Sequence, residues 1–126
     1  RSSLQLQGQM KQLQKQLELI TGQIMEATST SHSLEEFKGM KEGTEIFVPL
    51  SSGIFAKASL KDTSELLVNV GAGTVVAKDI SSAKKLISSQ VEEMQKVQQK
   101  MAGDLEKMME LAGQLENQLQ KMMPEQ

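Results

Sequence analysis

Few side chains in this sequence could carry out covalent or metal chemistry. The chain has one histidine, His32, and no cysteine. Without a second imidazole or any thiolate, the usual zinc-ligand sets and thiol nucleophiles are excluded, and His32 is expected to be an exposed surface imidazole. No P-loop sequence and no serine, histidine and aspartate set suggests catalysis. We therefore expect no enzymatic activity, no catalytic residues, no metal site and no cofactor.

Gly71 and Gly73 form the one glycine-rich segment that invites comparison with a nucleotide-binding turn. A dinucleotide-binding turn would carry a third glycine where this sequence has Val76, and it would open a helix. The segment here follows an apolar alternating run instead. Turn glycines between two strands explain the pattern, and no nucleotide site is predicted.

Charge and hydropathy exclude two further classes of partner. Fourteen basic and sixteen acidic residues give a net charge of -2, and no basic tract is longer than a lysine pair, so a nucleic-acid-binding surface has no support. No apolar run approaches the roughly 18 residues of a membrane span, and no signal-peptide hydrophobic block follows Arg1. We expect a cytoplasmic protein with neither nucleic-acid nor membrane partners.

The elements that must position any functional surface are two long helices. Apolar residues recur at alternating spacings of four and three in both arms of the sequence, and only Ser31 and Gln98 among these positions are polar. The first series is Leu6, Met10, Leu13, Leu17, Ile20, Ile24, Ala27, Ser31 and Leu34. The second is Ile87, Val91, Met94, Gln98, Met101, Leu105, Met108, Ala112, Leu115, Leu119 and Met122. Such a heptad repeat predicts a coiled coil. With three phenylalanines and no tyrosine or tryptophan, the chain should have little core of its own.

Between the arms the apolar period changes to two, which predicts four short strands in two β-hairpins. Short connections rich in turn residues separate them at 51–53, 61–64 and 71–73. A small sheet needs cover for its core side and its edges. We therefore expect oligomerisation through one apolar face, formed by Ile46, Val48, Leu50, Ile54, Ala56, Leu66, Val68 and Val70.

The predicted fold class is α+β: a long antiparallel α-helical coiled-coil hairpin with two β-hairpins at one end. The expected parts are an N-terminal helix at 1–42, the two hairpins at 43–80 and a C-terminal helix at 81–126. Ser81 is the expected N-cap of the second helix. If Met40 lies near Ala83, Ala27 falls opposite Gln98. The polar run at 28–33 is a possible bend in the first helix.

The segment "VPLSSGIFAKASLKDTSELLVNVGAGTVVAKD", flanked by two heptad helices, resembles the α-class subunit of prefoldin, also called GimC. The resemblance covers Thr44 to about Ile87 closely and the arms by pattern. It departs at "VPLSSG", where many relatives carry Gly-Ala-Gly after the Val-Pro pair. Two hairpins rather than one distinguish the α class from the β class.

The resemblance implies a chaperone that holds unfolded polypeptides without ATP. Two α and four β subunits would join their hairpins in a double β-barrel, and the coiled coils would deliver clients to a group II chaperonin. Unfolded client polypeptides would bind at the free tips, where apolar residues of both termini gather. These residues are Leu4, Leu6, Met10, Leu115, Leu119, Met122 and Met123. Without the resemblance, ordinary fraying with single exposed apolar residues is the better explanation of these ends. The alternative function is a structural coiled-coil adaptor that binds a folded partner along its stalk.

Overall fold

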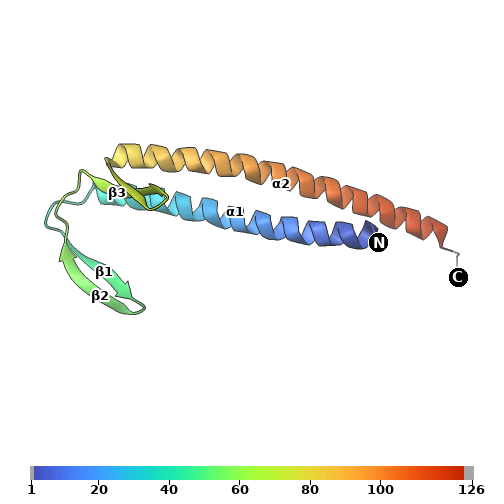
Figure 1. Cartoon of the computed structure of the whole chain (residues 1–126), viewed down its shortest axis with the longest axis horizontal. Helices are drawn as coiled ribbons and strands as arrows, with labels where there is room; N and C mark the ends of the chain where they lie inside the picture. The colour runs from blue at the N-terminus through green and yellow to red at the C-terminus, as the bar shows by residue number, and fades with distance from the viewer. Residues whose placement is uncertain (1, 124–126) are drawn as a thin grey trace. The chain divides into compact units, whose positions relative to one another are not determined.

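A computed structural model describes residues 2–123 of the chain. In sequence order, one long helix precedes the four strands and a second follows them (Figure 1). The elements in order are α1 (Ser2–Lys38), β1 (Glu45–Ser51), β2 (Ile54–Ser59), β3 (Leu66–Gly71), β4 (Thr74–Lys78) and α2 (Ile80–Met122). The predicted fold class, two long helices with two antiparallel hairpins, is confirmed. α1 continues as a helix through the polar run at 28–33.

The chain divides into two compact units. One, here called the helical unit, contains the described residues up to Glu26 and from Val91 onward. The other, the strand unit, spans Ala27–Gln90 and contains the four strands with the adjoining ends of both helices. The surfaces predicted for assembly and for client binding therefore lie in different units.

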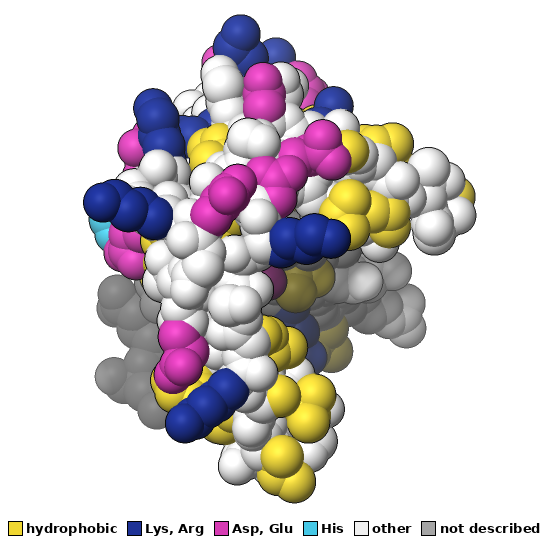
Figure 2. Space-filling view, turned by 90° about the vertical axis from the view of Figure 1, so that its left-hand side faces the viewer, with side chains coloured by type: hydrophobic (Ala, Val, Ile, Leu, Met, Phe, Trp, Pro, Cys, Tyr) yellow, Lys and Arg dark blue, Asp and Glu magenta, His cyan; other side chains and the backbone are white. Residues whose placement is uncertain are grey.

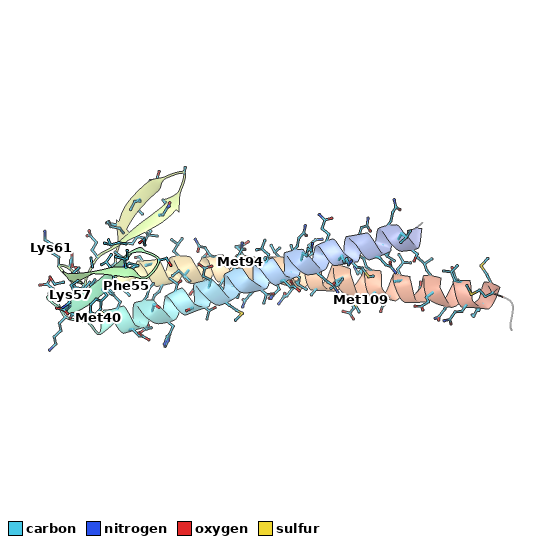
Figure 3. All side chains as sticks on the ribbon, turned by 90° about the horizontal axis from the view of Figure 1, so that it is seen from below. Met40, Phe55, Lys57, Lys61, Met94 and Met109 are labelled. Carbon is cyan, nitrogen blue, oxygen red and sulfur yellow. The ribbon has the colours of Figure 1, made fainter. Side chains whose placement is uncertain are left out.

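In the helical unit the segments of α1 and α2 run side by side and antiparallel (Figures 1 and 3). Every seam position predicted in α1 is buried or half-buried, and Leu6 and Ile20 are the most buried of them. In α2 the predicted seam positions are also half-buried from Val91 to Leu115, whereas Leu119 and Met122 are exposed. Burial thus follows the heptad repeat, as expected when apolar side chains leave water along a narrow stripe.

The alignment of the two helices differs from the expected one. Gln98 donates a hydrogen bond from Nε2 to Oγ1 of Thr21 over 3.0 Å, so Thr21 rather than Ala27 lies beside Gln98. α1 also ends earlier than expected, at Lys38, where the amide of Gly39 donates to the carbonyl of Glu36 over 3.1 Å and closes the last turn. Met40 consequently lies outside the helix.

The strand unit holds two separate two-stranded antiparallel sheets, β1–β2 and β3–β4. The two predicted β-hairpins are therefore confirmed. Gly53 and Gly73 close the two turns with φ of 79° and 72°, a left-handed conformation that favours glycine. Only Ala83 among the described residues of this unit is a buried hydrophobic, in agreement with the expected small core.

Each hairpin contains a β-bulge one residue before its turn. Leu50 is the extra residue between Pro49 and Ser51, and Val70 is the extra residue between Asn69 and Gly71. The strict alternation that grouped Leu50 with Val48, and Val70 with Val68, therefore stops at the bulge, because an extra residue has no cross-strand partner.

α2 begins earlier than expected. Oδ1 of Asp79 accepts a hydrogen bond from the backbone amide of Ser82 at 2.7 Å, and the amide of Ala83 donates to the Asp79 carbonyl at 3.0 Å. Asp79, not Ser81, is therefore the N-cap. A carboxylate serves this position well because the first amides of a helix have no partner within it.

Candidate functional site

The face predicted for assembly is formed as two apolar strips, one on each hairpin. In β1–β2, Ile46 lies opposite Ala58 and Val48 opposite Ala56; in β3–β4, Val68 lies opposite Val76. The half-buried members of the predicted set are Ile46, Ala56, Leu66 and Val68, and the exposed ones are Val48, Leu50, Ile54 and Val70. Both edges of each two-stranded sheet lack a ladder partner within the described chain, which is the arrangement that invites pairing with another strand.

A groove of about 350 Å³ lies between β3 and the helix ends of the strand unit. Leu66 and Val68 line it together with Ala83, Leu86 and Ile87. The side chains of β3 are thus partly covered by the chain's own helices. Sequence reasoning identified Ile87 as a seam residue but missed Leu86, which stands one residue outside the heptad seam.

The predicted client-binding residues differ widely in exposure. Leu6 is 7% exposed and is therefore part of the seam, and Met10 and Leu115 are half-buried. Leu4 is 72% and Met122 is 80% exposed, and Leu119 and Met123 are exposed as well. The available apolar surface at this end of the helical unit is therefore formed by these four side chains.

Further apolar side chains on the helical unit were not singled out from the sequence. Leu19, Met25, Val97, Met109 and Leu111 are all exposed although they lie on long helices (Met109 is labelled in Figure 3). Their signal in the sequence is that each stands outside the heptad seam. Leu17, Thr21, Gly22 and Met25 help to line a shallow groove on α1. Exposed apolar surface is consequently not confined to the end of the unit.

The histidine and two aspartates of the described chain make local contacts. His32 is exposed, and its Nε2 lies 3.2 Å from Oε1 of Glu36, which is one turn further along α1. No group of three histidine, cysteine, aspartate or glutamate side chains in the described part comes together to hold a metal ion. Hydrogen bonds from the backbone and hydroxyl of Ser64 hold the pKa of Asp62 below its usual value, and those of Ser82 do the same for the pKa of Asp79. Both shifts reflect local turns and caps rather than a reaction centre.

Neither described helix combines the length and the apolar character that a membrane crossing demands.

Comparisons with known proteins agree on one family. The family model described as prefoldin subunit matches residues 6–125. Over 110 residues the chain is 31% identical to the prefoldin subunit alpha of Methanobrevibacter smithii, covering 87% of this chain and 75% of that protein. Over 118 residues it is 34% identical to the prefoldin subunit alpha of Methanococcus aeolicus, covering 82% and 80%.

A solved structure has a similar fold. One chain of the filamentous PFD from Methanocaldococcus jannaschii superposes with a TM-score of 0.81, covering 93% of this chain and 98% of that one, at 14% sequence identity. The arrangement of long helices and hairpins is therefore one already seen in an experimentally determined protein.

Proposed function

Because the chain belongs to the prefoldin family as an α-class subunit, we propose that it holds non-native polypeptides without ATP and delivers them to a group II chaperonin. It would act in the cytoplasm, in an assembly of two α with four β subunits, and not as an enzyme. The observation that carries the proposal is the exposed apolar group formed by Leu4, Leu119, Met122 and Met123 at one end of an otherwise covered seam.

The chemistry of these four side chains suits clients of unspecified shape. Methionine and leucine are flexible, and methionine is unbranched, so they can repack against many apolar segments. Each contact is weak. Several subunits that engage one client together would raise the overall affinity through effective concentration. Leu6, Met10 and Leu115 would support this surface from within the seam rather than contact the client.

Assembly is proposed to use the apolar strips of both hairpins. Ile46, Val48, Ile54 and Ala56 of β1–β2 would face the interior of an intersubunit β-barrel, with Leu50 beside the turn. Leu66 and Val68 of β3–β4, with Val70 beside the turn, would join that interior by leaving the groove that they form with Leu86 and Ile87. Closure into a barrel would remove the free edges of both two-stranded sheets, which a monomer leaves open.

The test is aggregation of several unrelated denatured proteins in the presence of the assembled complex. Replacing Leu4, Leu119, Met122 and Met123 together by serine should abolish protection, while helix content and the mass of the complex stay unchanged. The matched control replaces the exposed residues Gln5, Gln118 and Gln120 by serine and should protect like the unmodified chain.

Two results would contradict the proposal. Full protection by the leucine and methionine variant, with partner subunits changed in the same way, would refute the site. No protection by the unmodified complex against any client would favour the structural adaptor. If this chain alone is changed, a partial loss is expected, because partner subunits contribute ends of their own.

A further inference from the structure

The nine methionines of this chain are distributed unevenly. Positions 41–93 contain none, so the four strands carry no methionine at all. In the described part of the strand unit Met40 is the one methionine, and the others lie on α1 and α2 in the helical unit. The chain has no cysteine, tryptophan or tyrosine. The thioether sulfur of methionine is therefore the group that a mild oxidant modifies most readily in this protein.

The methionines of the helical unit divide into two classes by exposure. One class stands at seam positions and is half-buried: Met10, Met94, Met101 and Met108. The other class is 57% to 80% exposed: Met25, Met109, Met122 and Met123. Figure 3 labels one member of each class, Met94 and Met109. An oxidant dissolved in water reaches the sulfur atoms of the exposed class first, because the partner helix shields those of the seam.

The two apolar surfaces of the molecule differ in the same respect. Two of the four exposed side chains in the proposed client site are methionines, Met122 and Met123. The large exposed apolar side chains of the hairpins are phenylalanine, leucine, isoleucine and valine. Figure 2 shows such hydrophobic side chains at the surface in the lowest part of the view, where β1–β2 lies in Figure 1. Oxidation of thioethers thus alters the client site and leaves the assembly surface unchanged.

We propose that Met122 and Met123 are oxidised by hydrogen peroxide and that this modification switches off client binding at the site proposed above, on which the inference rests. The sulfur lone pair attacks one peroxide oxygen, so an S–O bond forms while the O–O bond breaks. The hydroxide that leaves takes the proton of the new S–OH group and becomes water. Each sulfur is oxidised by two electrons to a sulfoxide, and the peroxide is reduced.

The sulfoxide changes the side chain from apolar to strongly polar. An apolar client segment offers no hydrogen bond to the new oxygen, so contact with the client would remove that oxygen from water without compensation. The hairpins contain no methionine, and the seam methionines are shielded, so assembly and the stalk persist. Reduction of the sulfoxide back to the thioether reverses the switch.

The first measurement follows the order of oxidation in the unassembled full chain under a limiting amount of hydrogen peroxide. Peptide mass mapping should find one added oxygen at Met122 and at Met123 before Met101 and Met108 acquire any. Met25 and Met109 should react in the early group as well, since they are exposed. Seam methionines that react as fast as Met122 would overturn the proposal, because damage to the stalk would then accompany loss of the site.

The second measurement mixes the oxidised chain with untreated partner subunits and compares the aggregation of denatured proteins with and without oxidation. The complex should keep its mass and lose part of its protection, because the partner subunits contribute ends of their own. The loss should match that of Met122→Gln combined with Met123→Gln, since a glutamine amide is polar as a sulfoxide is. Methionine sulfoxide reductases for both epimers should restore protection.

Two further variants assign the effect, each compared with itself before oxidation. Met122→Leu combined with Met123→Leu should lose no protection on oxidation, because leucine takes up no oxygen. The matched control, Met25→Leu combined with Met109→Leu, should lose as much as the unmodified chain. Equal losses in the two variants, or an unmodified chain that protects equally before and after oxidation, would overturn the switch alone. A complex that protects no client even before oxidation would refute the proposed function together with the switch.

Discussion

The two β-hairpins of the strand unit have the same strand pairing, but they differ in their turns, where only the second also has positive φ at Gly71 and Ala72, and in their surroundings. Both are antiparallel, both carry a bulge one residue before the turn, and both close with a left-handed glycine, at Gly53 and Gly73. β3 lies beside Ala83, Leu86 and Ile87 of the unit's own helix. On the corresponding face of β1–β2, Val48 and Ile54 are instead 39% and 57% exposed. Backbone pairing is therefore a local property, whereas the fate of each face depends on what lies next to it.

The largest expected effect comes from a charge on the face of β3–β4 that the helix covers. Val68→Asp would place an unpaired carboxylate beside Leu86 and Ile87, at a cost of several kcal/mol. The strand unit should loosen and the complex should dissociate, while the helices partly persist. Circular dichroism and sedimentation velocity would measure both. The matched control is Phe47→Asp on the exposed face, which should leave the fold intact. Equal loss of structure in both variants would contradict the difference in coverage.

Substitution of a covered side chain should also cost more than substitution of an exposed one where the two helices cover each other. Ile20→Ala removes a side chain that is buried in the seam and should lower the free energy of unfolding by about 2 to 4 kcal/mol. Leu19, its neighbour, is 66% exposed, and Leu19→Ala should change stability by roughly 0.5 kcal/mol or less. Leu17→Asn and Leu105→Asn at half-buried seam positions should also destabilise. Equal melting of the Ile20 and Leu19 variants would show that the seam is misplaced.

Substitutions in the two hairpin turns are a further test, because no other element covers Gly53 or Gly73. Gly53→Ala and Gly73→Ala each force a side chain into the left-handed region, at a cost of about 1 kcal/mol. Neither substituted Cβ would meet a neighbour within 4 Å, so the two losses should be similar. Thermal unfolding would measure them. A much larger loss at one turn would show that the positive φ of Gly71 and Ala72 beside Gly73 changes the cost of the added Cβ.

The smallest expected effect concerns the aspartates that follow each hairpin, Asp62 and Asp79. Hydrogen bonds from Ser64 and Ser82 lower the pKa of these carboxyls in the folded state. A lowered pKa contributes stability above the unfolded pKa, 3.8, and this contribution is lost as the pH falls through the folded value. The free energy of unfolding of Asp79→Asn should therefore fall less steeply than that of the unmodified chain as the pH is lowered below the unfolded pKa. Carboxyl titration by NMR would check both groups, and an ordinary pKa at Asp79 would refute its capping role.

Much of the fold was predictable because local chemistry decides it. The change of apolar period from 3.5 to 2 marks the helices and strands, and the turn glycines separate the hairpins. Seam residues such as Leu13 and Met101 were identified correctly because burial follows periodicity along one helix. The end of α1 and the N-cap of α2 were placed less well. Asp79 and Ser81 are both good caps, and only the observed hydrogen bond distinguishes them.

The sequence by itself determined the periodicities, the turns and which residues share a face. Only the tertiary structure decided the pairing of Gln98 with Thr21, because an apolar heptad repeat looks alike after a shift of seven residues and cannot specify its own alignment. It also decided that Val68 lies in a groove with the chain's own helix while Val48, at the same position of the other hairpin, is exposed. Alternation in a strand distinguishes two faces but not which one is covered, since that depends on neighbours far away in the sequence.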